Sequence, residues 1–176
     1  MPEALADQII QMLGQTADLY YRLILVVMPS GGGKTAALRK VHDQIGAPII
    51  NINLELSRRM LDLTERQRSV QLPKLFEEIV NESKGEIVLL DNIEILFDST
   101  LKQDPLRLLQ RISRNRTLIV AWNGTCNSTH FTYALPEHSE FKRYPIRDLI
   151  LLSPGHSADT QVNISASFKK PEGEKE

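Results

Sequence analysis

The stretch LILVVMPSGGGKT, residues 23–35, decides the fold of this chain. Five apolar residues run into a glycine-rich segment that ends in Lys34 and Thr35. This order is typical of a buried parallel strand, a phosphate-binding loop and a helix. Glycine has no Cβ, so its backbone N–H can approach a phosphate, and the amino end of the next helix favours an anion at the same point. We therefore predict a strand–loop–helix unit that binds the phosphates of ATP.

Within this unit, Lys34 is expected to contact the β- and γ-phosphates and the Thr35 hydroxyl to hold Mg²⁺. The pattern G-x-x-x-x-G-K-[ST] departs at Met28, which is tolerable there if its φ stays negative. The alternative is a glycine-rich turn that precedes Lys-Thr by chance, but the helical run AALRKVHDQI that follows disfavours it. The predicted nucleotide-binding residues are Pro29, Ser30, Gly31, Gly32, Gly33, Lys34, Thr35, Ala36 and Asp91.

A second informative stretch is EIVLLDNIEILF, residues 86–97, in which Asp91 ends an apolar strand. A carboxylate at this point can hold Mg²⁺ together with Thr35, so these two residues are the predicted metal ligands. In many ATPases of this type a glutamate follows the aspartate directly and orients the attacking water. Here that position is Asn92 and the nearest acid is Glu94, so the pattern supports Mg²⁺ binding better than fast hydrolysis.

Two further residues complete the candidate catalytic set of Glu94, Asn123 and Arg143. Asn123 ends the apolar run TLIVAW and could hydrogen-bond the γ-phosphate or the attacking water, although Asn-Gly could equally form a simple turn. Arg143 lies between the fourth and fifth strands, where an arginine finger acting on a neighbouring subunit is expected. Three other arginines compete for that role: Arg114, Arg116 and Arg147.

The apolar periodicity predicts one α/β domain, residues 1–155, and a polar tail, residues 156–176, that is at least partly disordered. Strands are expected near 22–28, 49–54, 87–90, 117–122 and 146–153, with helices near 2–14, 34–45, 54–70, 72–83 and 104–113. This alternation favours a five-stranded parallel sheet, order 5-1-4-3-2, flanked by helices and without a substantial lid. Residues 125–145 look irregular, and the run VNISASF could add one edge strand.

Charge and composition indicate which partners and which location to expect. The formal net charge of −1 gives no global field that attracts nucleic acid. Arg58, Arg59, Arg66 and Arg68 could form a contact surface for a subunit or for DNA, but a solvated helix face is the simpler interpretation. Nothing resembles a signal peptide or a membrane span, so we expect a cytoplasmic protein without membrane contact.

The tyrosine pair Tyr20-Tyr21 precedes the first strand. In nucleotide-binding sheets this segment often lies near the base, so either ring could contact adenine. Packing of the tyrosines at the edge of the sheet is an equally simple interpretation.

Three runs carry a narrower resemblance: NLELSRRMLDLTERQR, LLDNIEILFDSTLKQDPLRLLQRISRNRTLIVAWNG and FTYALPEHSEFKRYP. Together they resemble the BrxF family, small P-loop proteins of type three BREX (bacteriophage exclusion) defence systems. The resemblance implies an AAA+-like core in a bacterial cytoplasmic protein that acts with other BREX components against phage. It carries Lys34, Thr35 and Asp91 over as nucleotide and Mg²⁺ residues, while Met28 and Asn92 depart from the usual ATPase pattern.

Three functions remain open from the sequence. The first is an Mg²⁺-dependent ATPase that works as a homo-oligomer, and the second is a nucleotide-dependent assembly module that does not hydrolyse ATP. A P-loop small-molecule kinase is the third, but the position of Asp91 and the strand ending at Asn123 suit it poorly.

Overall fold

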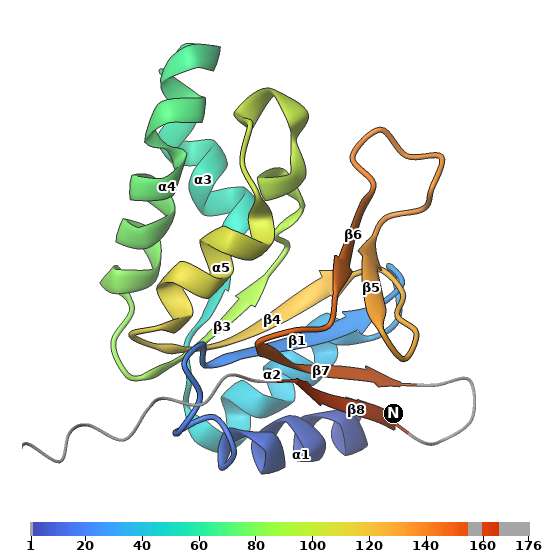
Figure 1. Cartoon of the computed structure of the whole chain (residues 1–176). Coiled ribbons are helices and arrows are strands. Elements are labelled where there is room, and N and C mark those ends of the chain that lie inside the picture. The colour runs from blue at the N-terminus through green and yellow to red at the C-terminus, as the bar shows by residue number, and fades with distance from the viewer. Residues whose placement is uncertain (1, 155–159, 166–176) are drawn as a thin grey trace, which may run out of the picture.

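A parallel sheet forms the centre of the computed structural model, which describes residues 2–154 and 160–165 (Figure 1). The main sheet has the order β2-β3-β4-β1-β7-β8. Its strands are β1 (Leu23–Met28), β2 (Ile49–Asn51), β3 (Ile87–Asp91), β4 (Thr117–Asn123), β7 (Leu149–Pro154) and β8 (Thr160–Ser165). All neighbours are parallel except β7 and β8. The predicted order 5-1-4-3-2 is therefore confirmed, and β8 supplies the edge strand that the VNIS run suggested.

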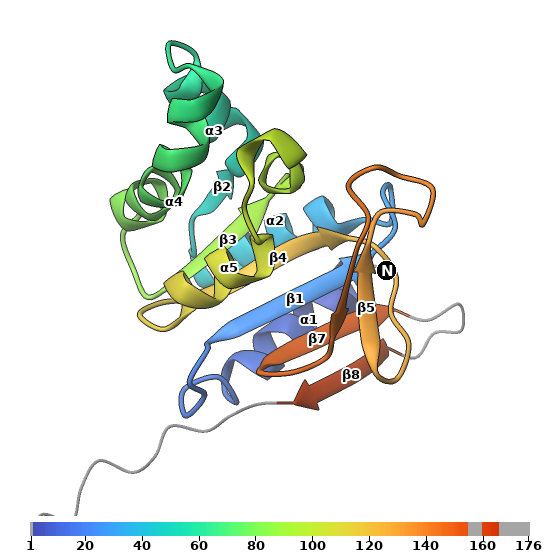
Figure 2. The ribbon, with the colours of Figure 1, turned by 45° about the horizontal axis from the view of Figure 1, so that its top comes forward.

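Helices cover both faces of this sheet (Figures 1 and 2). They are α1 (Pro2–Leu13), α2 (Lys34–Ile45), α3 (Ile52–Met60), α4 (Glu65–Glu82) and α5 (Pro105–Ser113), with short 3₁₀ turns η1 (Glu94–Phe97) and η2 (Ser99–Leu101). Alternate residues of β1 point to opposite faces, as a strand requires: Ile24 and Val26 pack with α1 and α2, whereas Leu25 and Val27 pack with α3, α4 and α5. Apolar side chains on both sides explain why β1 is a continuous hydrophobic run.

Three sequence expectations are corrected by the structure. The strand predicted over 49–54 stops at Asn51, because the Asn51 side chain accepts a hydrogen bond from the Leu54 backbone N–H and caps α3. The helices expected at 54–70 and 72–83 instead divide at Thr64, which forms a capping box with Gln67 and begins α4. The apolar pattern of the helix predicted over 54–70 also predicts that Leu54 and Leu61 are buried, but both are exposed.

Pro73 lies inside α4 rather than in a first turn. Its ring nitrogen has no hydrogen, so it cannot donate to the carbonyl of Ser69 four residues earlier. The side-chain amide of Gln103, from the loop after η2, donates to that carbonyl at 2.8 Å instead. A contact distant in sequence thus allows the helix to continue through the proline.

The supposedly irregular segment 125–145 contains an antiparallel hairpin, β5 (His130–Tyr133) and β6 (Lys142–Pro145). The Trp122 indole N–H donates to the Thr132 carbonyl at 2.9 Å and ties the hairpin to the end of β4. Gly124 makes this approach possible, since a Cβ there would come within 1.7 Å of the Thr132 carbonyl oxygen. Aromatic packing of Phe131, Tyr133 and Tyr144 around Trp122 completes the contact.

The end of the chain is described only in part. No helix follows β7 within the described residues, and none of the described helices is long and apolar enough to cross a bilayer. The predicted boundary at 155/156 remains a prediction. The polar run KKPEGEKE at residues 169–176, for which the sequence predicts disorder, lies outside the described residues.

Candidate nucleotide-binding site

The carboxyl ends of β1, β3 and β4 meet at one edge of the sheet and place the predicted site residues together. Met28 at the end of β1 pairs with Asn123 at the end of β4, and Asn51 at the end of β2 pairs with Asp91 at the end of β3. A cavity of about 430 Å³ opens at this edge. It is lined by Ser30, Gly31, Gly33, Lys34, Thr35, Ala36, Arg39, Asp91, Asn92, Glu94, Ala121 and Asn123.

The loop before α2 has the conformation that a phosphate cradle requires. Gly31 and Gly33 adopt positive φ angles of 80° and 92°, which L side chains rarely adopt. A Cβ on Gly32 would come within 3.0 Å of the Pro29 carbonyl oxygen. Met28 ends β1 and is not among the described residues with positive φ, so the variant position keeps a conformation open to any residue. Pro29 and Gly32 shape the loop without lining the cavity.

Lys34 and Thr35 begin α2 and point to the interior of this loop. Lys34 is a buried residue, 7% exposed, and its amine donates to the carbonyl oxygens of Met28 and Pro29 at 3.0 and 2.9 Å. Burial lowers the pKa of Lys34 from its ordinary value, and the nearby carboxylates of Glu94 and Asp91 oppose that change. A phosphate would place a charged acceptor beside this amine, which donates to neutral carbonyl oxygens in the structure.

Asp91 and Thr35 are in direct contact although 56 residues separate them in sequence. The Thr35 hydroxyl donates to Asp91 Oδ2 at 2.7 Å, and the Asn92 backbone N–H donates to Asp91 Oδ1 at 3.0 Å. A hydroxyl and a carboxylate oxygen this close form a donor set suited to Mg²⁺. These residues would hold the ion, which when bound would offset the charge of the phosphates.

Glu94 is the carboxylate that the structure brings beside Asn123. The Asn123 side-chain amide donates to Glu94 Oε1 at 2.6 Å. The chain turns at Asn92, whose φ is 51°, and this left-handed turn followed by η1 directs Glu94 into the cavity. Asparagine tolerates such a φ better than glutamate does, which gives a physical reason why the acid stands at 94 and not at 92.

Sequence reasoning missed two residues of the site. Asn53, near the start of α3, donates from its amide to Glu94 Oε2 at 3.0 Å and accepts from the Ile95 backbone N–H at 2.8 Å. Asn53 and Asn123 therefore hold one carboxylate from both sides. Arg39, one turn into α2, also lines the cavity. A polar residue just after a strand was the available signal for Asn53, whereas Arg39 was indistinguishable from other helical arginines.

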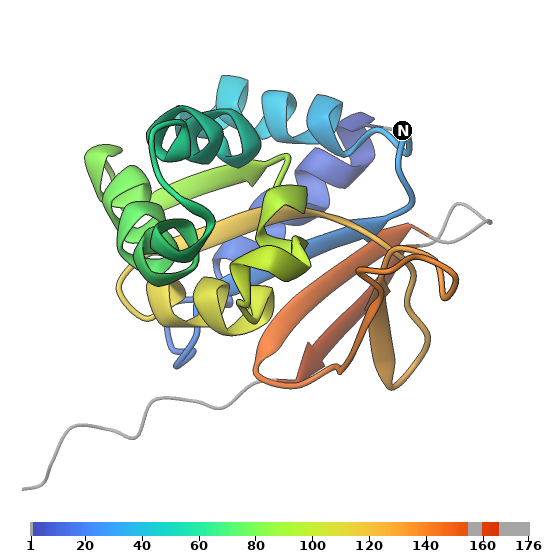
Figure 3. The same cartoon turned by 90° about the horizontal axis from the view of Figure 1, so that it is seen from above.

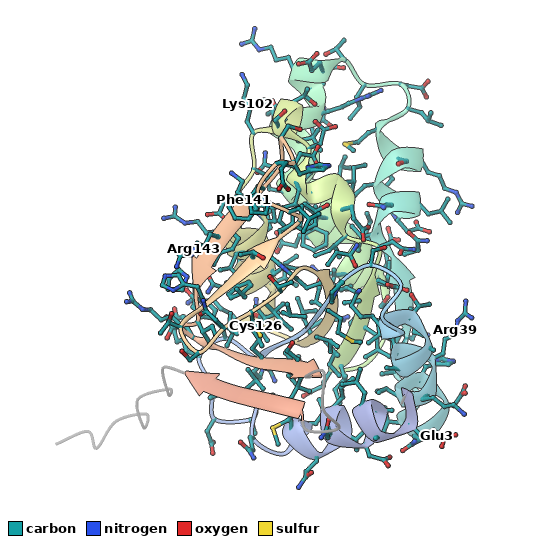
Figure 4. The ribbon with its side chains drawn as sticks, turned by 90° about the vertical axis from the view of Figure 1, so that its right-hand side faces the viewer. Glu3, Arg39, Lys102, Cys126, Phe141 and Arg143 are labelled. Atoms are coloured by element: carbon teal, nitrogen blue, oxygen red, sulfur yellow. The ribbon has the colours of Figure 1, made fainter. Side chains whose placement is uncertain are left out.

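Two predicted groups lie elsewhere. Arg143 is an exposed residue of β6 on the opposite side of the molecule from Arg39 (Figure 4), so it does not line the cavity of its own chain. Tyr20 and Tyr21 precede β1 at the amino edge of the sheet, a strand length from the phosphate loop. Neither tyrosine lines the cavity at the phosphate loop, and Tyr21 lines a separate cavity beside α5, so contact with adenine stays a prediction.

Comparison with known proteins identifies the domain. A family model described as "ATPase family associated with various cellular activities (AAA)" matches residues 24–141, from β1 to the loop before β6. The chain belongs to the AAA family. The phosphate loop, Asp91 and Asn123 all fall inside the matched region, so this AAA domain is of the P-loop, nucleotide-binding kind.

Other comparisons add less. A solved structure of PCH-2 from C. elegans is similar with 22% sequence identity and a TM-score of 0.35. The match covers 69% of this AAA chain and 35% of the PCH-2 chain. The present chain thus spans about a third of that longer protein. No curated protein matches the sequence.

Proposed function

We propose that this AAA protein is an Mg²⁺-dependent ATPase that hydrolyses ATP to ADP and phosphate. The observation that carries the proposal is the convergence of Lys34, the Thr35–Asp91 pair and the Glu94–Asn123 pair on one cavity. Lysine and backbone N–H groups suit the phosphates, Thr35 and Asp91 suit the metal, and Glu94 supplies a carboxylate able to orient a water.

Nucleotide binding is tested by titrating the protein with Mg²⁺–ATP in a calorimeter. Lys34→Ala should abolish the heat of binding, whereas Lys40→Ala should not. Lys40 is a matched control because it lies in the same helix and, among the residues that the structure describes, pairs only with exposed Glu3, at 3.5 Å. Absence of any binding heat with folded wild-type protein would refute the proposal at its first step.

Turnover is tested separately by phosphate release. A second candidate function, a nucleotide-dependent assembly module that does not hydrolyse ATP, is favoured by Asn92 standing where the usual glutamate is expected. Tight ATP binding with no phosphate release, in the presence of DNA and partners, would select that function over the ATPase. Robust turnover that is lost on Glu94→Gln would exclude it.

We also propose that Arg143 acts in trans within a homo-oligomer. Its distance from its own cavity leaves a neighbouring subunit as the site it could serve. Light scattering with and without Mg²⁺–ATP tests the assembly. Mixing inactive Lys34→Ala protein with inactive Arg143→Ala protein tests the residue, because restored turnover requires one intact shared site. A mixture that stays inactive while forming mixed oligomers would reject Arg143.

The biological setting that we propose is a BREX-type anti-phage complex in the bacterial cytoplasm. This part rests on the sequence runs that resemble BrxF, not on the fold. It predicts that tagged protein expressed from its own locus co-purifies with other BREX components. Loss of phage resistance on Lys34→Ala would support it, and unchanged resistance would count against it.

A further inference from the structure

The outer face of α5 carries a line of arginines far from the nucleotide cavity. Arg107, Arg111 and Arg114 are spaced by four and three residues, so they share one side of the helix. Their side chains are exposed, 85% for Arg107 and 69% for Arg111. The opposite face of α5, including Leu109, is buried against the sheet. The arginines are therefore not needed to pack the helix.

Acidic neighbours neutralise this line incompletely. Asp104 lies 3.7 Å from Arg107 and Glu77 lies 3.9 Å from Arg111, and all four side chains are substantially exposed, so these pairs are weak. Arg114 forms no ion pair within the described part of the chain. Its guanidinium lies over the Tyr20 ring, 4.8 Å from the centroid.

The surface beside these arginines is hollow. One cavity of about 340 Å³ is lined by Glu77, Asn81, Arg111, Ile112, Arg114 and Asn115. A second, of about 370 Å³, is lined by Tyr21, Arg107, Gln110, Arg111 and Arg114. The two cavities share Arg111 and Arg114 and therefore adjoin each other, and we call the two together the α5 groove.

The α5 groove lies at the amino edge of the sheet. Tyr21 stands just before β1 and Asn115 just before β4, so the groove and the phosphate loop are at opposite ends of the same strands. Seen from above, α5 lies beside the segment that leads into β1 (Figure 3). The second cavity agrees with this, because Tyr21 from that segment lines it together with Arg107 and Gln110 of α5. A ligand in the α5 groove would not compete with ATP.

We propose that the α5 groove binds single-stranded nucleic acid. Three exposed guanidinium groups along one line suit successive backbone phosphates. Tyr21 and the Tyr20–Arg114 stack supply flat faces on which bases can stack. The side chains of Asn81, Gln110 and Asn115 add hydrogen-bonding groups to the groove. The aromatic faces favour nucleic acid over an acidic peptide, because a peptide would use only the charges.

Fluorescence anisotropy with a labelled oligonucleotide of about 16 thymidines tests the proposal on the full chain. Three phosphate contacts predict that log K falls with log salt concentration with a slope of about −2. The double variant Arg111→Glu/Arg114→Glu should lose binding at least about tenfold and flatten that slope. Tyr21→Ala should weaken binding about tenfold because it removes the stacking face. Tyr21→Phe keeps that face and should bind about as tightly as wild type.

A matched control separates this site from general charge effects. Arg58→Glu/Arg66→Glu makes the same charge change at two residues of α3 and α4 that do not line the α5 groove, and should bind nearly as well as wild type. Lys34→Ala should bind the oligonucleotide normally, so this test is independent of the ATPase proposal. An unchanged midpoint of chemical denaturation shows that the α5 variants are folded.

Several results would overturn the proposal. One is no binding by about 100 µM protein at low salt, the weak end of non-specific affinities. If the Arg58/Arg66 control loses as much oligonucleotide affinity as the Arg111/Arg114 variant, binding depends on the overall charge of the protein and not on the α5 groove. Tighter binding of duplex than of single strand, or equal competition by polyglutamate, would assign the groove to another ligand.

Discussion

The most informative perturbation of the nucleotide site is Glu94→Gln. The Glu94 carboxylate accepts two amide hydrogen bonds, from Asn123 at 2.6 Å and from Asn53 at 3.0 Å. Glutamine keeps the shape but offers one acceptor and one donor, so with Asn53 and Asn123 oriented as they are, its –NH₂ end faces the –NH₂ group of one of them. Leaving that donor unpaired costs about 1–3 kcal/mol of the free energy of unfolding. Loss of a group that orients water should lower turnover about 10²- to 10⁴-fold.

A second substitution separates these two effects. Asn53→Asp in the Glu94→Gln background restores a donor–acceptor pair, since the introduced aspartate can accept from the introduced glutamine amide with one oxygen and from the Ile95 N–H with the other. The free energy of unfolding should return toward wild type, while turnover should stay low. The assays are chemical denaturation and phosphate release, with ATP binding measured as a control.

Two outcomes would refute this reasoning. Turnover within about threefold of wild type for Glu94→Gln would show that Glu94 is not the water-orienting group, since such a group contributes far more. A double variant no more stable than Glu94→Gln would show that the two amides do not hold the carboxylate as the distances indicate.

Three further predictions concern the supports of the site. Gly124→Ala should displace the hairpin from Thr132, break the Trp122 bond and lower the free energy of unfolding by at least about 1–3 kcal/mol, measured by denaturation. Gln103→Ala should cost about 1 kcal/mol by leaving the Ser69 carbonyl without its donor, and less in a Pro73→Ala background where the helix N–H returns. Burial raises the pKa of Tyr133 to about 12, so the unfolded chain loses its phenol proton first. Stability should therefore fall as the pH rises from about 10 toward 12, and Tyr133→Phe should make that fall shallower than in wild type.

Local pattern was sufficient for the nucleotide loop and the sheet order. A run such as LILVV is buried on both faces, and a glycine loop ending in Lys-Thr has few other uses, so β1, the loop and α2 could be predicted together. The same is true of β3 with Asp91 and of α5 with its Asp104 cap. These features depend on neighbours in the sequence.

Contacts between distant segments decided the rest. The continuation of α4 through Pro73 depends on Gln103, 30 residues later, so no local rule could predict it. The β5–β6 hairpin depends on Trp122 and on the space left by Gly124. Asn53 reaches Glu94 across 41 residues, and the α5 groove joins Tyr21 to Arg114. Sequence by itself determined which side chains could bind phosphate and metal. The tertiary structure decided that the amides of Asn53 and Asn123 hold the Glu94 carboxylate, and which arginines line the α5 groove. The physical reason is that hydrogen-bond partners and surface neighbours are set by how the layers pack, and periodicity records only that a face is buried.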